Sequence, residues 1–597
     1  MSPSADLPSP VLSAADLAAP PQPRILVPEK VSAEGLALLR SLYDVDFRPA
    51  GVPADELLSL IPAYHGLIVR SETKVTAAVL AAGRKLRVVA RAGVGVDNID
   101  VDAATAQGII VVNSPSGNIV AAAEHTVALL LASARNVGRA DTTLKAGKWE
   151  RGKLVGVEVG RKTLGVIGLG KVGMKVARMA IGLGMSVVAL DPYASADVAK
   201  QAGVRMVGSL AEILPEVDFL TIHTPLLATT LNLLGEAEFQ KMRKTARVLN
   251  VARGGVYNEE ALVKALDEGW IAGAGIDVFT SEPPKEGSFA AKLAAHPKVV
   301  STPHLGASTV EAQENVSMDV CTQVLEILRG GLPTAAVNAP LILPEEYRRL
   351  QPFVKLVEKI GSLYTQHFVG GRGGMLGGRR FELSYHGELA GISNTRPLFA
   401  ALVKGLVSSI SDAGGRDVNI VNATLIAKER GMAIDEKHVR DAPASTYASA
   451  VTLRSFTGSG GDKEEQIIEG YVSGKSIYIS KLDRFEANFH PEGTMLVLHN
   501  YDEPGKIGNV GLALGRHGIN ITFMQVAGLN QEAKAAVEAA ASSVAGSVAD
   551  GPIEDSESGR LTKEALMILG VAGDVTNEVV DDLSKSEGIL NVSLIRL

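Results

Sequence analysis

Three side chains suited to proton transfer beside a carboxylate group stand directly after apolar, strand-like runs of the chain. Arg253 follows the run VLNVA, Glu282 follows GAGIDVF, and His304 ends VVSTPH. Open parallel sheets bind their ligands at the carboxyl ends of the strands. We therefore expect the three side chains to meet at one edge of a sheet.

This set could take a proton from a hydroxyl group while hydride leaves the neighbouring carbon. Imidazole titrates near neutrality, which suits His304 to act as the base, and as the acid in the reverse reaction. A carboxylate at Glu282 would orient the ring and favour its protonated form. Arg253 can bind a carboxylate through two parallel hydrogen bonds and polarise the reacting oxygen. The set predicts oxidation of a small 2-hydroxy acid.

A glycine-rich turn upstream predicts the hydride acceptor. Gly168, Gly170 and Gly173 in GLGKVG follow the strand-like TLGVI and open a helical stretch. They permit a tight turn, close approach of a pyrophosphate to the backbone, and close packing of helix and strand. Asp191 ends the next strand, where its carboxylate would bind ribose hydroxyls and repel a 2′-phosphate. We therefore expect NAD rather than NADP, with Asp277 contacting the nicotinamide carboxamide.

Two blocks of alternating strands and helices must position these residues. Strands are predicted at RILVP, GLIVR, RVVAR and IIVVN in the first block, and from TLGVI to KVVSTPH in the second. The alternation predicts an α/β fold with two Rossmann-like, doubly wound parallel sheets. We expect one long helix from near Val120 through LKAG, and another from Thr309 to about Arg329 that returns to the first block.

The same patterns divide the chain into a tail and four folded domains. The predicted divisions are a disordered tail (1–24), a discontinuous substrate-binding domain (25–120 and 305–335), an NAD-binding domain (121–304), an α+β domain (340–490) and a C-terminal βαββαβ module (494–597). Two further segments are expected to be loops or disordered, the Gly- and Arg-rich stretch 369–380 and an insertion at about 530–560.

Composition limits the partners and the compartment. The 597 residues carry a net charge of −7, which gives no electrostatic reason to expect nucleic acid or an anionic membrane. The single cysteine, Cys321, lies in a helical pattern, which predicts a buried thiol in a reducing compartment. The first residues lack the basic and apolar regions of a secretory signal. We expect a cytoplasmic enzyme that needs no metal ion.

The signature motifs resemble those of the D-isomer-specific 2-hydroxyacid dehydrogenases over roughly residues 25–335. They are GLGKVG, NVARGG, GAGIDVF followed by SEPP, and STPHLGASTVEAQ. The resemblance implies that Arg253, Glu282 and His304 are catalytic. It implies an NAD site formed by Gly168, Leu169, Gly170, Lys171, Val172, Gly173, Asp191, His223, Thr224, Pro225, Ala252, Asp277 and Gly306.

Other segments resemble the phosphoglycerate dehydrogenases within that family, which implies 3-phosphoglycerate as the substrate. These segments are VRSETKVT, ARAGVGVDNID, NSPSGN and GKWERGKLVGVEV. Arg91 has the charge that a phosphate needs, and Arg151 resembles an arginine that reaches a neighbouring subunit. Val94 departs from relatives that carry threonine there. The implied substrate-binding residues are Arg70, Ser71, Arg91, Gly93, Val94, Gly95, Asn118 and Arg151.

The carboxyl-terminal half is similar to the extra domains of the long phosphoglycerate dehydrogenases. Residues 340–490 resemble their additional substrate-binding domain, and the last module resembles an ACT domain, which often pairs across subunits to bind amino acids. This implies a homodimer or homotetramer, with L-serine at Asp502, Gly505 and Asn520. A dimerisation surface without any ligand is the alternative.

Three other functions share part of this pattern. Hydroxypyruvate or glyoxylate reductases and 2-hydroxyglutarate dehydrogenases would use the same catalytic set, although the reductases usually lack the two extra domains. A non-enzymatic, NAD-sensing interaction protein would keep the dehydrogenase core without an ACT module. The two appended domains therefore weigh towards the phosphoglycerate dehydrogenases.

Overall fold

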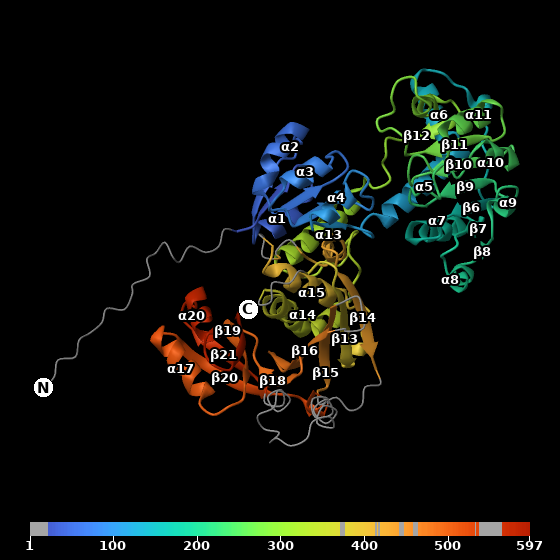
Figure 1. Cartoon of the computed structure of the whole chain (residues 1–597). Coiled ribbons are helices and arrows are strands. Elements are labelled where there is room, and N and C mark those ends of the chain that lie inside the picture. The colour runs from blue at the N-terminus through green and yellow to red at the C-terminus, as the bar shows by residue number, and fades with distance from the viewer. Residues whose placement is uncertain are drawn as a thin grey trace. The chain divides into compact units, whose positions relative to one another are not determined.

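A computed structural model describes most of the chain, in two compact units (Figure 1). One unit comprises Met1–Ile99 with Val112–Gly331, and the other Asp100–Val111 with Leu332–Leu597. The described residues are 22–370, 376–411, 415, 418–440, 447–457, 464–531, 533–535 and 564–597.

The first sheet has five strands in the order β2-β1-β3-β4-β5. Its pairs β1–β2, β1–β3 and β3–β4 are parallel, and the order reverses direction between β1 and β3. Helix α13 packs against α1 and β4, so a late segment of the chain completes this lobe. The strands are β1 (Arg24–Val27), β2 (Asp44–Phe47), β3 (Gly66–Val69), β4 (Val88–Arg91) and β5 (Ile110–Asn113); the helices are α1 (Ala33–Arg40), α2 (Ala54–Leu60), α3 (Ala77–Ala82), α4 (Val101–Ala106) and α13 (Val310–Leu328).

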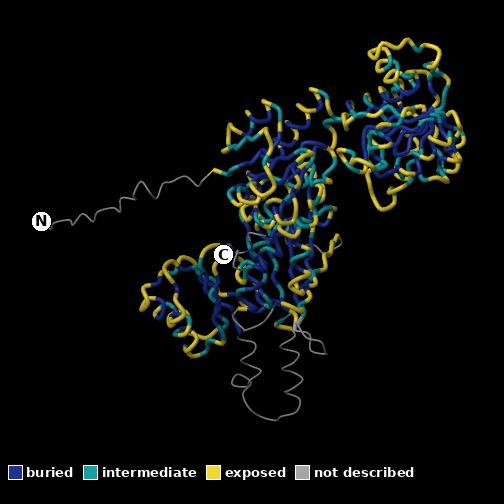
Figure 2. Tube along the Cα trace, turned by 90° about the horizontal axis from the view of Figure 1, so that it is seen from above, coloured by how far each residue is buried: buried dark blue, intermediate teal, exposed yellow. Residues whose placement is uncertain are grey.

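The second sheet has seven parallel strands in the order β12-β11-β10-β9-β6-β7-β8. Its central strands are buried almost throughout, as expected for a sheet covered by helices on both faces (Figure 2). The strands are β6 (Thr163–Ile167), β7 (Ser186–Leu190), β8 (Val204–Met206), β9 (Phe219–Ile222), β10 (Arg247–Asn250), β11 (Gly273–Ile276) and β12 (Val299–Ser301). The helices are α5 (Ile119–Ala134), α6 (Val137–Lys145), α7 (Lys171–Gly182), α8 (Ala196–Gln201), α9 (Leu210–Ile213), α10 (Glu236–Lys241), α11 (Glu259–Asp267) and α12 (Phe289–Ala295).

The predicted single helix from Val120 is wrong, because the chain breaks between α5 and α6. Asn136 takes a φ of 53°, in the left-handed region that asparagine tolerates better than most residues. Its amide donates to the carbonyls of Leu154 and Val155 at 3.3 and 3.2 Å. The helix therefore does not continue through Asn136, whose side chain bonds to a later loop instead.

The second unit contains a mixed six-stranded sheet and an antiparallel four-stranded sheet. Their orders are β14-β13-β15-β16-β17-β18 and β20-β21-β19-β22; among the described strands of this unit, β13 and β14 pair in parallel and the other pairs are antiparallel. The strands are β13 (Arg380–Gly387), β14 (Ala433–Val439), β15 (Ser449–Thr457), β16 (Glu464–Ser473), β17 (Ser476–Leu482), β18 (Phe485–Phe489), β19 (Thr494–Tyr501), β20 (Asn520–Gly528), β21 (Glu564–Ala572) and β22 (Ile589–Arg596). The helices are α14 (Pro344–Tyr364), α15 (Arg396–Ser408), α16 (Ala423–Glu429), α17 (Lys506–Arg516) and α20 (Asn577–Ser584).

The predicted fold class is confirmed, including the βαββαβ order of the last module. Cys321 is fully buried on α13, and burial raises the pKa of its thiol to about 12. The predicted tail and the insertion at 530–560 lie largely outside the described residues, as do residues 371–375 of the stretch 369–380. At the two ends of that stretch, Val369 closes a π-helical turn and Arg380 begins β13. No helix in the described ranges is long and apolar enough to cross a membrane.

Candidate active site

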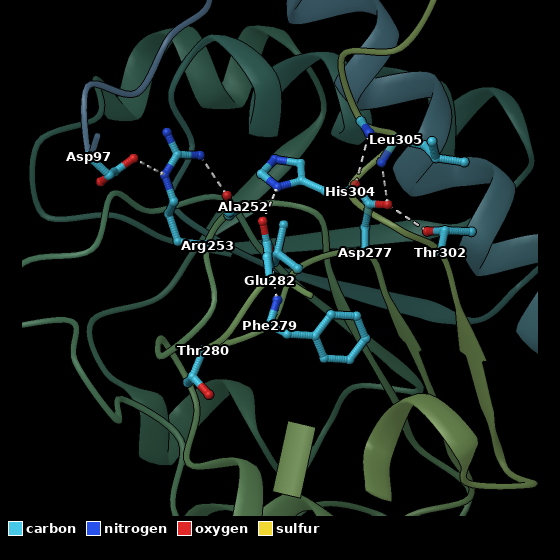
Figure 3. A network of polar contacts seen from close by, with 12 residues as sticks. Asp97, Ala252, Arg253, Asp277, Phe279, Thr280, Glu282, Thr302, His304 and Leu305 are labelled. Atoms are coloured by element: carbon cyan, nitrogen blue, oxygen red, sulfur yellow. Dashed lines mark hydrogen bonds and ion pairs between the residues drawn. The ribbon is translucent and has the colours of Figure 1, made fainter. Parts of the chain in front are cut away.

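His304 and Glu282 form the centre of a polar network at the carboxyl ends of β11 and β12 (Figure 3). His304 Nδ1 lies 2.7 Å from Glu282 Oε2, and Glu282 Oε1 accepts the backbone N–H of Phe279 at 3.1 Å. His304 has a φ of 55°, an uncommon conformation for a residue with a side chain. About two fifths of its side chain (43%) is exposed. The ring is therefore fixed at Nδ1, which leaves Nε2 for a reacting group.

The pKa of Glu282 reflects this contact. Burial raises the pKa of the carboxyl group, but the hydrogen bonds from His304 and from the Phe279 N–H outweigh it and hold the pKa below its usual value. Glu282 is therefore an anion at neutral pH.

Asp277 organises the loop that carries His304. The carboxylate has no exposed surface and accepts hydrogen bonds from the Thr302 hydroxyl and from the N–H groups of Leu305 and Gly306, at 2.6 to 2.8 Å. His125 Nε2 from α5 lies 3.2 Å away. Burial raises the pKa of Asp277, but hydrogen bonds from His125, Thr302 and Leu305 bring it below its usual value. Contact with a nicotinamide carboxamide stays a prediction.

Arg253 stands beside a loop of the first lobe. Its Nε lies 3.2 Å from Asp97 Oδ2, and its Nη1 donates to the carbonyl of Ala252 at 2.7 Å (Figure 3). Asn250 supports this turn, accepting the Ala252 N–H and donating to the Arg253 carbonyl. A Cβ on Gly95 would overlap Arg253 Nη2, so only glycine leaves room for the guanidinium.

Arg91, the last residue of β4, is the clearest sign of an anion site. Its Nε is buried and has no hydrogen-bond partner within the described residues. Burial lowers the pKa of Arg91, and the charges of Arg253 and Arg70 lower it further, whereas Asp97 and Glu29 raise it. A guanidinium with a buried, unsatisfied N–H near two other cations is stabilised by an anion with several oxygen atoms. A Cβ on Gly93 would overlap Arg91 Nη1.

A buried carboxylate, Glu29, and a half-buried amide, Asn98, hold the loops around this site. Glu29 follows β1, and its carboxylate accepts the N–H groups of Arg70, Glu72 and Thr73 at 2.9 to 3.2 Å. Asn98 donates to the carbonyls of Arg70 and Thr73 at 2.8 and 2.7 Å. The Glu29 bonds join the loop after β1 to the loop after β3. The Asn98 bonds join the loop after β3 to the loop after β4, which carries Gly93 and Gly95.

The remaining substrate-side predictions occupy varied positions. Ser71 and Val94 are exposed, and Asn118 Oδ1 at the start of α5 is buried without a partner among the residues that the structure places. Arg151 is exposed in a short 3-10 helix, Arg151–Lys153, so it is free to reach beyond this chain. Each of these roles stays a prediction.

The glycine loop fits a dinucleotide pyrophosphate. Gly168 has a φ of 89°, and a Cβ on Gly173 would overlap the Gly168 carbonyl oxygen, so both positions require glycine. A Cβ on Gly170 would meet no atom within 4 Å, and no side chain caps the first turn of α7. The loop therefore presents open space beside free helix N–H groups, which favour a phosphate. Lys171 Nζ contacts Ser116 Oγ at 2.7 Å, and Leu169 and Val172 complete the loop.

Other cofactor candidates surround the same point, where the strand order reverses between β6 and β9. Asp191 accepts the N–H groups of Leu169 and Tyr193 at 2.7 and 2.8 Å. His223 contacts Thr221 Oγ1, and burial lowers the pKa of His223 to about 4, which keeps it neutral. Thr224 Oγ1 is buried and unpartnered within the described ranges, and Pro225 is exposed.

The predicted L-serine residues are not brought together in one chain. Asp502 and Gly505 follow β19, and Gly505 caps the start of α17 with a φ of 91°. Asn520 begins β20. In the register, Tyr501 at the end of β19 pairs with Glu564, whereas Asn520 pairs with Ala572 at the other end of β21. Asp502 and Asn520 therefore lie at opposite ends of the four-stranded sheet.

Several residues that shape the site were missed in the sequence. His125, Glu29 and Asn98 contact loops distant in the chain, and no local pattern marks such a contact. Glu259, which accepts two hydrogen bonds from Thr280, is preceded by an N-cap asparagine, a pattern that predicts only a helix start. The signal that could have found Glu29 is an acidic residue directly after the first strand.

Two family models match parts of this chain. Residues 127–306 match the NAD binding domain of D-isomer specific 2-hydroxyacid dehydrogenases, and residues 349–477 match the D-3-phosphoglycerate dehydrogenase intervening domain. A chloroplastic D-3-phosphoglycerate dehydrogenase of Arabidopsis thaliana is 43% identical, over 85% of this chain and 81% of its own.

Two microbial relatives extend the match. The D-3-phosphoglycerate dehydrogenase of Synechocystis sp. is 41% identical, over 84% of this chain and 87% of its own. That of Archaeoglobus fulgidus is 37% identical, over 96% of this chain and 100% of its own, so the similarity includes the last module. With its NAD-binding domain and intervening domain both matched, the chain belongs to the D-3-phosphoglycerate dehydrogenase family of NAD-dependent oxidoreductases.

Proposed function

We propose that this enzyme oxidises 3-phospho-D-glycerate to 3-phosphohydroxypyruvate, the first committed step of L-serine synthesis. The observation that carries the proposal is the buried, unsatisfied Arg91 Nε in the cationic region of Arg70 and Arg253. A phosphorylated hydroxy acid supplies two anionic groups to such a region, its carboxylate and its phosphate. The His304–Glu282 pair supplies the base.

The residues of the chain divide the reaction between them. NAD held at the Gly168–Gly173 loop would supply the acceptor for the hydride that leaves C2 of the substrate with the C–H electron pair. His304 Nε2 takes the proton of the C2 hydroxyl, so that the C2–O bond becomes a carbonyl. Glu282, already bonded to Nδ1, stabilises the resulting imidazolium. Arg253 binds the carboxylate and the reacting oxygen, and Arg91 with Arg70 binds the phosphate.

The first test follows NADH formation with 3-phosphoglycerate, glycerate, 2-hydroxyglutarate and lactate side by side. Equal or better turnover of an unphosphorylated acid would contradict the proposed substrate. Arg91→Met should raise KM for 3-phosphoglycerate about tenfold or more, because a hydrogen bond to a charged group contributes about 1.5–3 kcal/mol. The kcat/KM for glycerate should change little. Arg84→Met, at an exposed arginine of the same lobe, is the matched control.

The proposal extends to the oligomeric state of the enzyme and to its inhibition by L-serine. The enzyme is a cytoplasmic homodimer or homotetramer in which Arg151 of one subunit reaches the site of another. L-serine binds where Asp502 and Gly505 of one chain meet Asn520 of a second, since one chain holds them at opposite ends of a sheet. Light scattering tests the assembly. Millimolar L-serine should inhibit the native enzyme and lose its effect in Asn520→Ala; an unchanged native rate would leave the module structural.

A further inference from the structure

Glu259, at the start of α11, is a buried carboxylate that the proposed mechanism does not use. Only 8% of the residue is exposed. Its Oε1 accepts the backbone N–H of Thr280 and its Oε2 accepts the Thr280 hydroxyl, each at 2.7 Å. Burying a charged group costs free energy unless hydrogen bonds compensate. Here both carboxylate oxygens accept hydrogen bonds from the same residue, Thr280. Thr280 stands two residues before Glu282, in the loop after β11.

The turn that precedes α11 holds this loop at two further points. The Tyr257 hydroxyl donates to the Val278 carbonyl at 3.4 Å. Burial, and then the charge of Glu259, hold the pKa of Tyr257 well above its usual range, so this hydroxyl remains a donor. A Cβ on Gly254 would overlap the Phe279 carbonyl, so the two backbones are in direct contact there. Residues 278–280 are therefore fixed by residues 254–259.

The contacts of residues 254–259 with residues 278–280 link Arg253 to the loop that carries Glu282. Gly254 directly follows Arg253, so the turn that carries the arginine also supports the loop that carries the glutamate. The Phe279 N–H donates to Glu282 Oε1, which leaves Oε2 directed at His304 (Figure 3). A shift of the Phe279–Thr280 backbone would move Glu282 relative to the imidazole. The two Thr280 bonds to the Glu259 carboxylate restrain that backbone from outside the loop.

We infer that Glu259 is a positioning residue for Glu282. By accepting both hydrogen bonds from Thr280, it keeps the Glu282 carboxylate against His304 Nδ1 and correctly placed relative to Arg253. The inference rests on the proposed function, because it takes Glu282 and His304 as the catalytic pair. The role belongs to the hydrogen bonds rather than to the charge. Glutamine can make both bonds, since its carbonyl accepts the N–H and its NH₂ donates to a reoriented hydroxyl.

The test compares Glu259→Ala, Glu259→Gln and Thr280→Val with the native enzyme. Glu259→Ala should lower kcat about ten- to a hundredfold, as expected when a catalytic group is displaced by about 1 Å. NADH affinity, measured by fluorescence quenching, should stay within about twofold, because the dinucleotide loop is separate. Glu259→Gln should retain kcat within about threefold. Thr280→Val, which loses the hydroxyl bond alone, should lie between them and guards against misfolding of the alanine variant.

A pH profile separates positioning from general destabilisation. If Glu259→Ala releases Glu282 from the ring, the acid limb of kcat/KM should move to lower pH, because the protonated imidazole loses its stabilising anion. Asp277 and Arg253, the other charged groups near His304, are unchanged in these variants. A merely structural role would lower the melting temperature and leave the acid limb in place.

Glu282→Gln decides which proposal fails. If Glu282→Gln lowers kcat and moves the acid limb while Glu259→Ala and Thr280→Val do neither, the inference about Glu259 is overturned and the proposed function stands. A Glu259→Gln variant as impaired as Glu259→Ala also overturns it, because the bonds would then be irrelevant. If Glu282→Gln itself changes neither quantity, the proposed catalytic pair is wrong.

Discussion

His304 is held in its reactive orientation by its backbone as much as by its ring. Its N–H donates to the carbonyls of Asp277 and Thr302, at 2.9 and 3.0 Å, while the Asp277 carboxylate accepts the next two N–H groups. Backbone conformations of this kind persist when the surroundings over-determine them, and they concentrate at functional sites. The orientation of the base is therefore built into the loop, and Glu282 completes it.

The position of the Arg253 guanidinium depends on the absence of a side chain at Gly95. Gly95→Ala should displace the guanidinium, because the new Cβ would overlap Nη2, and kcat/KM for 3-phosphoglycerate should fall about a hundredfold. The melting temperature should change little, since the displaced atom is the mobile end of an arginine. Gly138→Ala, where a Cβ would meet nothing within 4 Å, is the control. Native activity in Gly95→Ala would remove Arg253 from substrate binding.

The sequence predicted those residues whose position follows from where a strand ends. Arg253, Glu282, His304 and the glycine loop each follow an apolar run, and the geometry of a parallel sheet then brings them to one edge. Glu29 could not be predicted in this way, because its partner Arg70 is 41 residues away and the contact depends on how two loops fold. Asp97 was missed for the same reason, since its partner Arg253 is 156 residues away.

Among the elements, strand positions were predicted better than helix ends. Buried parallel strands leave a continuous apolar run, which is a strong local signal. The break between α5 and α6 depends instead on the bonds of Asn136 to Leu154 and Val155, and tertiary contacts of that kind override the local helical pattern. The short edge strand β2 was also missed, because its residues are only partly buried and carry two aspartates.

At the start of α7, we expect Gly170 to be needed for NAD binding and Gly173 to be needed for folding. Gly170→Ala should weaken NADH binding about tenfold or more without lowering the melting temperature, because its Cβ would occupy the open space beside the free helix N–H groups. Gly173→Ala should lower the melting temperature, because its Cβ would overlap the Gly168 carbonyl. Gly182→Ala, in open space at the end of α7, is the control. Fluorescence titration and thermal melting measure the two effects, and equal losses in both glycine variants would contradict the assignment.

An ion-pair cluster fastens the turn before β18 to the four-stranded sheet. Glu564 on β21 contacts Arg484, and its Oε2 lies 2.9 Å from His499 Nε2 on β19. Burial raises the pKa of Glu564, but His499 and Arg484 outweigh it and hold the pKa below its ordinary value of 4.5. The stability that this shift contributes is present above pH 4.5 and is lost as the pH falls through the lower, folded pKa.

Chemical unfolding at several pH values tests this cluster. The free energy of unfolding of the native chain should fall as the pH drops below about 4.5, and Glu564→Gln should be less stable at neutral pH but show a flatter decline. Glu578→Gln, at an exposed carboxylate on α20, should keep the native slope. A native slope in Glu564→Gln would assign the acid sensitivity to other groups.

At the scale of the whole molecule, the nucleotide-binding domain and the appended domains have separate hydrophobic cores. Apolar side chains of the seven-stranded sheet and its helices form two core clusters in the first unit. In the second unit, Met495 and Val497 on β19 and Ile568 on β21 join the core of the six-stranded sheet. The last module is therefore built onto the intervening domain rather than standing alone.

Calorimetry should reveal these units as two unfolding transitions with different sensitivities. NADH at a hundred times its Kd should stabilise the transition of the first unit by about 2.7 kcal/mol, because a ligand stabilises only the part that binds it. Ile568→Ala should lower the other transition by about 2–5 kcal/mol, through the cavity left in the shared core of the second unit. Hydrogen exchange would assign each transition to its residues. If NADH and Ile568→Ala both moved one common transition, the two units would unfold together.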